Sequence, residues 1–305
     1  MMPAGADIRA ASAGGLLAAW EEARAQGRNN RAAAAKLGRS EAELIASGCG
    51  RFVTRLRPDA LALLHHLPTL GEIKAVVRNP TAVIERAGTV RSIELNGVGA
   101  ILVEADHFEM ACQSAQWNKA FALREKTERG LKLSLQFFTA EGISAAKFFL
   151  RPGSDLHALR DLVRACASPD QSPRETIEPR APEYSLPLQR PAPVAPGALL
   201  AFLQAAAGAR HALTFVARNR AACLSTDKAV ERVKRSDRGG WVNVLDEGMD
   251  IHLHDDRIRY LRSVPDPHGD CGWFHWFSER QAIALSLRCG QGWETLAQAA
   301  GVQPE

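Results

Sequence analysis

The chain has 305 residues, of which 46% are hydrophobic and 24% are charged, and its formal net charge is +4. This composition is typical of a folded protein of one large or two ordinary domains and excludes a chain that is disordered throughout. Because the cationic residues are scattered, the charge suits an anionic ligand without requiring nucleic acid. No run of about 18 apolar residues occurs and the N-terminus lacks an apolar core, so we expect neither a membrane span nor a signal peptide.

Six cysteines are spread along the chain at wide and irregular intervals, and none of them forms a CxxC pair. This spacing argues against a structural zinc site. We therefore expect reduced thiols, and the missing signal peptide then indicates a cytoplasmic protein.

The first elements in chain order are helical. Residues 14–48 carry apolar residues at helical spacing, and the run from Ser40 to Glu43 predicts a capping box at the start of a short helix. Residues 31–44 also resemble a helix-turn-helix, but Glu41 and Glu43 on its second helix would repel phosphate. We therefore expect helix packing in this region and no nucleic-acid partner.

A strand-rich region follows these helices. Residues 71–150 consist of short runs of β-branched and aromatic residues separated by turn formers, and residues 155–167 predict an amphipathic helix. Residues 169–196 contain eight of the sixteen prolines, which predicts an extended linker. A further helix, strands over 211–288 and a short closing helix complete the chain.

The order of elements before the linker is repeated after it, which indicates an internal duplication. Residues 76–93 align with residues 216–233 at an offset of 140, so that the Arg-Asn pair at 78–79 matches the pair at 218–219. We therefore predict an α+β protein with two structurally similar halves. The expected boundaries are 1–168 for the N-terminal repeat, 169–197 for the proline-rich linker and 198–305 for the C-terminal repeat.

A distinctive feature of the second half is the run "MDIHLHDDRI" at 249–258, which places His252 and His254 two positions apart. Alternate side chains of a strand share a face, so a strand here would present both imidazoles opposite Ile251 and Leu253. Such a face is either a solvated surface or the wall of a ligand cleft.

Five segments resemble, in order, the bacterial haemin-degrading and haem-trafficking proteins of the HemS/ChuX type. They are "KLGRSEAELIASGCG", "LPTLGEIKAVVRN", "QWNKAFALRE", "SLQFFTAEG" and "WVNVLDEGMDIHLHDDRI". The resemblance covers most of 15–165 and 198–300. It implies a two-repeat, HemS-like fold in which each half is a twisted antiparallel β-sheet with flanking helices. It also implies haem as the ligand, a cytoplasmic location, and a role in haem-iron uptake as a carrier or a haem-degrading factor.

The sequence departs from the family pattern where the family holds iron. Members carry an axial histidine in a helical segment between the halves, whereas no histidine lies here between His157 and His211. The arginine that members place over the distal face of haem aligns with Ala111. The resemblance therefore leaves open whether this chain opens the haem ring.

The candidate ligand-binding residues lie in the second half. The Gly-His-Ile-Arg element of single-repeat members matches the stretch at His252 and His254. Neutral imidazole is a good axial ligand of haem iron, so His252 is the candidate metal ligand. Arginines would anchor the propionates and an aromatic ring would lie on the porphyrin. The candidate cofactor-binding residues are His252, His254, Arg218, Arg257, Arg288 and Trp273, and we assign no catalytic residue.

The resemblance also implies partners. An inner-membrane haem transporter would supply haem, and a haem oxygenase and a second copy of the chain are further candidates, while no stable membrane insertion is expected. The alternative is a diverged interaction or regulatory module of the same fold that no longer binds haem. Haemin titration distinguishes the two classes of protein.

Overall fold

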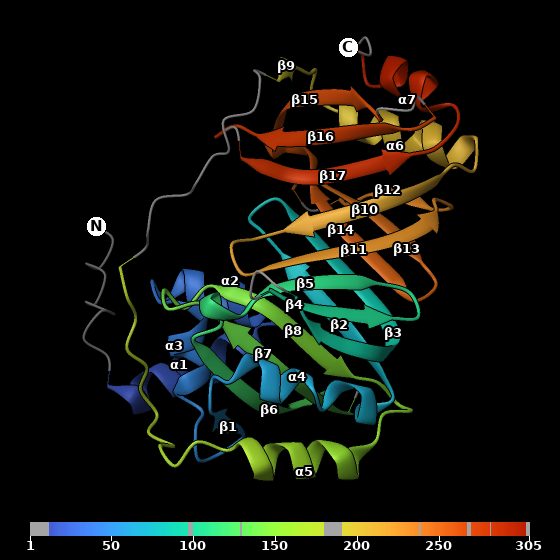
Figure 1. Cartoon of the computed structure of the whole chain (residues 1–305). Helices are drawn as coiled ribbons and strands as arrows, with labels where there is room; N and C mark the ends of the chain where they lie inside the picture. Colours follow the sequence, from blue (N-terminus) through green and yellow to red (C-terminus); the bar gives the residue numbers. More distant parts are fainter. Residues whose placement is uncertain are drawn as a thin grey trace, which may run out of the picture. The chain divides into compact units, whose positions relative to one another are not determined.

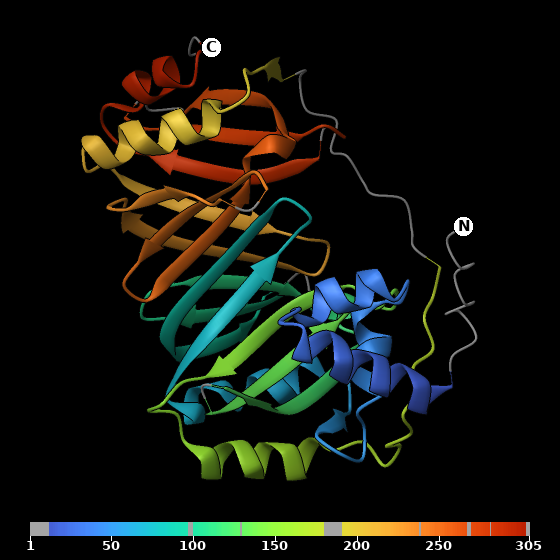
Figure 2. The ribbon, with the colours of Figure 1, turned by 180° about the vertical axis from the view of Figure 1, so that it is seen from behind.

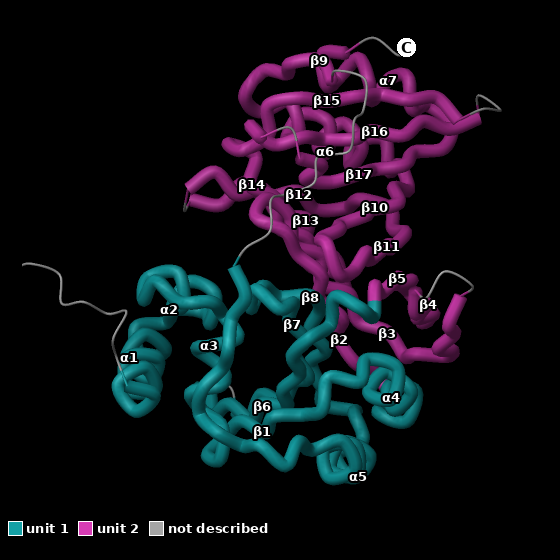
Figure 3. Tube along the Cα trace, turned by 60° about the vertical axis from the view of Figure 1, so that its left-hand side comes forward, with its two compact units in different colours: residues 1–71, 114–181 teal, residues 72–113, 182–305 magenta. Residues whose placement is uncertain are grey.

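The computed structural model describes residues 12–96, 100–128, 130–179, 191–237, 239–266, 270–280 and 282–302. The chain forms two compact units (Figure 3). Unit 1 contains Met1–Gly71 and Ser114–Ala181, and unit 2 contains Glu72–Gln113 and Pro182–Glu305. A segment from the first half of the chain therefore belongs to the same unit as the second half.

Unit 1 begins with the helices α1 (Ala13–Ala25), α2 (Asn30–Lys36) and α3 (Glu41–Ala46), in the region where the sequence predicts them. Ser40 caps α3 as expected, because its hydroxyl accepts a bond from the Glu43 amide and its own amide donates to the Glu43 carboxylate. The helices bury Trp20 and Leu44 in one apolar cluster with Phe121 of the sheet. This burial attaches the three helices to the sheet of the unit.

The sheet of unit 1 is antiparallel, with the order β1–β6–β7–β8. Its strands are β1 (Val53–Leu56), β6 (Lys119–Thr127), β7 (Gly130–Phe138) and β8 (Ser144–Leu150). The remaining elements of the unit are α4 (Ala60–Leu64), α5 (Leu156–Cys166) and the 3-10 turns η2 (Leu67–Leu70) and η3 (Ser114–Gln116). α5 is the amphipathic helix expected at 155–167, and it packs against α4 and β1 (Figure 1).

The first part of the proline-rich segment is bound to unit 1. The Arg55 guanidinium donates to the carbonyls of Ser172 and Arg174 and forms an ion pair with Glu175. A charge-assisted bond and two bonds to main-chain oxygens hold this stretch beside β1. Residues 168–178 are therefore an ordered strap on unit 1, where the sequence predicts a linker.

Unit 2 contains two antiparallel sheets that share the long strand β3 (Ala82–Leu95). The short sheet has the order β2–β3–β14–β13–β12. The long sheet has the order β3–β4–β5–β11–β10–β17–β16–β15–β9. The other strands are β2 (Glu72–Arg78), β4 (Ala100–Ala105), β5 (Glu109–Gln113), β9 (Ala192–Pro193), β10 (Ala212–Arg218), β11 (Ala222–Ala229), β12 (Val233–Arg235), β13 (Trp241–Asp246), β14 (Met249–His254), β15 (Ile258–Pro265), β16 (Gly272–Ser278) and β17 (Ile283–Cys289).

Two helices, α6 (Ala198–Gly208) and α7 (Trp293–Ala299), cover one face of the long sheet. Figure 2 shows α6 lying along β15–β17. The ring of Phe202 on α6 lies 4.7 Å from that of Phe274 and 5.5 Å from that of Trp276, centroid to centroid. These buried aromatic contacts hold the helices on the sheet. The opposite side of these strands carries the half-buried Trp273 and His275 and the exposed Arg288, and we call it the open face.

The two halves of the chain exchange strands within unit 2. The hairpin β2–β3 pairs through β3 with β14, and the equivalent hairpin β10–β11 pairs through β11 with β5. The two registers correspond, because Ala82 lies opposite Leu253 and Ala222 lies opposite Cys112. Reciprocal pairing of this kind is what two copies related by a local two-fold axis produce. The arrangement confirms an α+β protein built of two similar halves.

The Arg-Asn pairs that indicated the duplication lie where the two hairpins meet. Asn79 Nδ2 donates to the carbonyls of Arg218 (3.1 Å) and Ala284 (2.8 Å), and Asn219 Nδ2 donates to the carbonyl of Arg78 (3.0 Å). Each amide oxygen also accepts main-chain N–H groups of its own turn. Each asparagine therefore closes one hairpin and binds it to the other.

The compact units and the predicted repeats divide the chain differently. The repeats were expected at 1–168 and 198–305, whereas residues 72–113 belong to unit 2 because their strands pair with strands of the second half. The strand exchange is the physical reason for the difference. The boundaries of the repeats stay a prediction.

Candidate functional site

The two histidines lie on β14, which runs between β13 and β3 in the short sheet. Ile251 and Leu253 are buried, whereas His252 and His254 are half-buried on the opposite face. This alternation confirms the predicted strand and arises because only one of its faces packs into the core.

His252 is the central member of five side chains that lie in register across the short sheet. Lys234, Asn243, His252, Val83 and Arg78 occupy neighbouring positions on β12, β13, β14, β3 and β2, and we call them the His252 row. Adjacent strands lie about 4.8 Å apart, so Lys234 and Arg78 are each roughly 10 Å from His252 along the sheet. The row thus has an imidazole in its middle and a cation at each end.

Asn243 orients the His252 imidazole. Nδ1 of the ring lies 2.7 Å from Asn243 Oδ1, and because an amide oxygen only accepts, Nδ1 carries the proton. In the neutral ring the lone pair is then on Nε2, which is the atom available to a metal. Histidines that bind metals usually have their second nitrogen held by an oxygen acceptor in this way.

His254 lies on the same face as His252, two residues further along β14. Its ring lies 4.8 Å from the ring of Trp241, its partner on β13. Burial, and after it the charge of Arg257, lower the pKa of His254 below its usual value, so this imidazole is neutral at neutral pH. Arg257 lies in the turn η4 (Asp255–Arg257) and donates to the carbonyl of Pro80 at 3.2 Å.

The other predicted residues lie on the long sheet. Arg218, Trp273 and Arg288 belong to β10, β16 and β17, and Trp273 is directly opposite Arg288 on the open face. The structure therefore divides the predicted site residues between two sheets. His252 and His254 lie on the short sheet, with Arg257 in the turn that follows them, and Arg218, Arg288 and Trp273 lie on the long sheet.

His275 occupies the middle of this open face. Its Nδ1 lies 2.9 Å from Ser286 Oγ, and its ring is nearly parallel to that of Trp273, with the centroids 5.8 Å apart. Burial, followed by the charges of Arg218 and Arg262, lowers the pKa of His275 to about 4. At neutral pH the open face thus combines arginines with a neutral imidazole and an indole ring.

The first half of the chain supplies most of an equivalent row across the long sheet. Glu94, Leu102, Ala111, Cys223 and Arg218 are neighbours on β3, β4, β5, β11 and β10. They correspond, in this order, to the members of the His252 row. The two rows are therefore the same structural position in the two halves.

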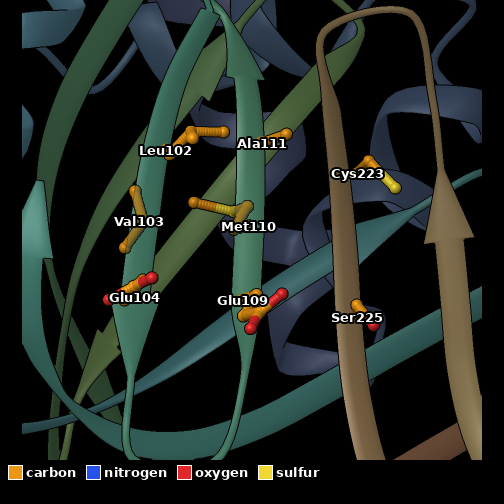
Figure 4. A pocket seen from close by; sticks show the side chains of 8 residues that line it. All are labelled: Leu102, Val103, Glu104, Glu109, Met110, Ala111, Cys223 and Ser225. Carbon is orange, nitrogen blue, oxygen red and sulfur yellow. The ribbon is translucent and has the colours of Figure 1, made fainter. Parts of the chain in front are cut away.

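The equivalent row differs from the His252 row at its centre, where Ala111 and Leu102 replace His252 and Asn243. A pocket of about 200 Å³ lies there (Figure 4). Its lining residues are Leu102, Val103, Glu104, Glu109, Met110, Ala111, Cys223 and Ser225. The first half thus has a small hollow at the position where the second half has an imidazole and an amide.

Sequence reasoning missed Asn243 and Trp241, although the hairpin between β13 and β14 contains the signal. Its turn includes Gly248, which has a φ of 70° and marks the point where the chain reverses. Counting outward from this turn places Asn243 opposite His252 and Trp241 opposite His254. Lys234 is placed by the hairpin of β12 with β13, whose ladder continues to the bond from the Ser236 amide to the Trp241 carbonyl.

Two further findings limit the chemistry. Among the described residues, no three or more His, Cys, Asp and Glu side chains are grouped so that they could hold a metal ion. A metal at His252 would therefore need most of its ligands from elsewhere, as an iron porphyrin provides. Within the described part of the chain, none of the helices is long and apolar enough to cross a membrane.

The fold and the site define a class of protein, a duplicated α+β protein with a half-buried histidine in the middle of a sheet. Residues 38–166 match the model of the haemin-degrading HemS/ChuX domain. This match covers less than half of the chain and lies wholly before the proline-rich segment.

Several known proteins are similar to this chain in sequence or in structure. The hemin transport protein HmuS of Yersinia pestis is 33% identical over 168 residues, which are 52% of this chain and 49% of that protein, so the match spans about half the length of the curated relative. Holo-PhuS, a heme-binding protein from Pseudomonas aeruginosa, is 28% identical with a TM-score of 0.85 over 94% of this chain and 99% of that one. The heme degrading enzyme ChuS of Escherichia coli O157:H7 shares the fold, at 22% identity and a TM-score of 0.81 over 92% of this chain and 94% of that one.

Proposed function

We propose that this protein binds haem, or a closely related tetrapyrrole, in bacterial haem-iron utilisation. The observation that carries the proposal is the His252 imidazole, whose Nδ1 is held by Asn243 so that Nε2 is free to act as an axial ligand. The printed names of the relatives, a hemin transport protein and a heme-binding protein, support the same ligand.

The surroundings of His252 suit a flat, anionic macrocycle. Lys234 and Arg78 stand at the two ends of the row, roughly 10 Å from the ligand residue, where cations can pair with propionates at the edge of a porphyrin. The rings of His254 and Trp241 add a partly apolar surface beside the row.

Arg218, Arg288 and Trp273 remain candidates for contacts to the propionates and the ring. They lie on the open face of the long sheet, where Trp273 is opposite Arg288. The histidine of that face is His275, whose pKa is lowered by burial. A protein that binds the macrocycle on this face would lose affinity on substitution of these residues and not of His252. The same titration therefore distinguishes the two faces.

The test is a haemin titration of the whole chain, followed by the Soret band. We expect saturation at one equivalent for the natural protein, and a weaker complex with a shifted Soret maximum for His252→Ala. His157→Ala is the matched control, because His157 is an exposed histidine on α5 of unit 1. Identical spectra for the natural protein, His252→Ala and His254→Ala would remove this site. Weak binding without stoichiometry would favour the interaction or regulatory module.

Two roles are compatible with haem binding. Ring opening requires oxygen and electrons, so ascorbate added in air to the haem-loaded protein should abolish the Soret band if the protein degrades haem. A stable band would indicate a carrier, which would receive haem from an inner-membrane transporter and deliver it to a haem oxygenase. The cytoplasmic location and a homodimer are further predictions of this proposal.

A further inference from the structure

We infer that Asn243 is the positioning residue of the His252 site, selecting the imidazole tautomer and setting how strongly the ring donates electrons to a bound metal. The inference names a further determinant of the proposed haem site and rests on that function for its effect on iron. Its effect on the imidazole itself can be measured without haem.

The position of Asn243 is set by the sheet and not by a loop. Asn243 and His252 are directly opposite each other on β13 and β14, and His252 pairs with Val83 of β3 on its other side. Directly opposed residues of an antiparallel pair have their side chains close together, so the bond of 2.7 Å forms without any displacement of the main chain. A contact built on the middle strands of a sheet is held more accurately than one built on a loop.

The chemistry follows from the direction of this hydrogen bond. An acceptor on Nδ1–H stabilises the tautomer with its lone pair on Nε2 and makes that nitrogen more basic. A carboxylate in place of the amide would strengthen both effects, and an apolar side chain would remove them. Loss of such a partner typically weakens metal affinity about 10- to 100-fold.

The other half of the chain shows that the hairpin itself does not need the amide. The equivalent hairpin β4–β5 has Leu102 where β13 has Asn243, and Ala111 where β14 has His252. Its ladder is complete with a leucine in that place. Asn243→Leu is therefore a substitution that the architecture already accepts, and Asn243→Asp is its conservative counterpart.

The first experiment measures the tautomer of His252 by nitrogen-15 NMR of the ligand-free protein. We expect a proton on Nδ1 in the natural protein and in Asn243→Asp, and loss of this preference in Asn243→Leu, with His157 unchanged in all three. A proton on Nε2 of His252 in the natural protein, or a tautomer that Asn243→Leu leaves unaltered, would overturn the inference.

The second experiment measures haemin affinity and the potential of the bound iron. Asn243→Leu should weaken binding about 10- to 100-fold and raise the potential, whereas Asn243→Asp should keep the affinity and lower the potential. If Asn243 had a purely structural role, both substitutions would change the affinity and the potential in the same direction. That result would refute the inference. If His252→Ala changes the Soret band and Asn243→Leu does not, the inference fails and the proposed function stands. If His252→Ala has no effect, the proposed site fails.

A third experiment transfers the pair to the equivalent row. Ala111→His should introduce an imidazole without a defined tautomer, and adding Leu102→Asn should place its proton on Nδ1, as measured by the same NMR experiment. The same tautomer in the single and the double variant would contradict the assigned role of the amide.

Discussion

Asn79 is one of the side chains that join the two halves of the chain within unit 2, so substituting it should measure how much its bonds to the second half contribute to stability. Its Nδ2 donates to the carbonyls of Arg218 and Ala284, and its Oδ1 accepts the N–H groups of Thr81 and Ala82 in its own turn. Asn79→Ala removes both sets of bonds. Asn79→Asp keeps an acceptor for the turn and replaces the donors with an oxygen that faces the two carbonyls.

The size of the effect follows from the number of bonds lost. A hydrogen bond contributes about 0.5–1.5 kcal/mol net, and a buried group that loses its partner costs more. We therefore expect Asn79→Ala to lower the free energy of unfolding of unit 2 by about 2–4 kcal/mol, and Asn79→Asp by about 1–3 kcal/mol.

Amide hydrogen exchange is the appropriate assay, because a chain with two compact units need not unfold in one step. The amides of β10 and β11 should exchange faster in both variants, while those of β6 and β7 in unit 1 should keep their rates. If the amides of β10 and β11 exchange in Asn79→Asp at the rates of the natural protein, the bonds to the second half contribute nothing to stability. That result would refute the reasoning.

Two further predictions concern titratable groups in the interior. The pKa of His275 is about 4 in the folded protein against 6.5 for the free side chain, so between these values the unfolded chain binds a proton that the folded chain does not. The free energy of unfolding should therefore fall as the pH is lowered from about 6.5 to about 4. Urea midpoints measured across this pH range should change less in His275→Gln than in the natural protein. The same pH dependence in both proteins would contradict the lowered pKa of His275. Lys147→Met leaves the buried Glu41 carboxylate without its ion-pair partner and should cost about 3–5 kcal/mol in urea unfolding. Adding Glu41→Gln should restore much of this loss, and a double variant as unstable as Lys147→Met would count against the pair.

The candidate site contains one feature that the local sequence predicted, the strand of His252, and one that it did not, the contact of His252 with Asn243. The period of two in the run around His252 predicted a strand with both imidazoles on one face, and the structure confirms it. The partner Asn243 lies nine positions earlier in the chain, and its contact depends on the register of the hairpin. Register follows from where the chain turns, so the position of Gly248 is the sequence feature that links the two residues.

The duplication was detectable for a related reason. The Arg-Asn pairs at 78–79 and 218–219 recur because each asparagine satisfies main-chain groups both in its own turn and in the other hairpin. An aspartate or a serine in that place cannot donate and accept in the same way. The signal that indicated a repeat is thus the contact that joins the copies, which the spacing alone could not reveal.

The sequence by itself determined the class of fold, the helices of residues 14–48, the strand that carries His252 and the two similar halves. The helices and the strand depend on residues close together in the chain, where periodicity and capping act directly. The two halves were visible because the same short patterns recur at an offset of 140. Only the tertiary structure decided that residues 72–113 join the second half, and that Arg218, Arg288 and Trp273 lie on a different sheet from His252. The physical reason is that the main-chain bonds of a strand are the same for every partner, so the choice of neighbour depends on how distant surfaces pack and not on the pattern within the strand.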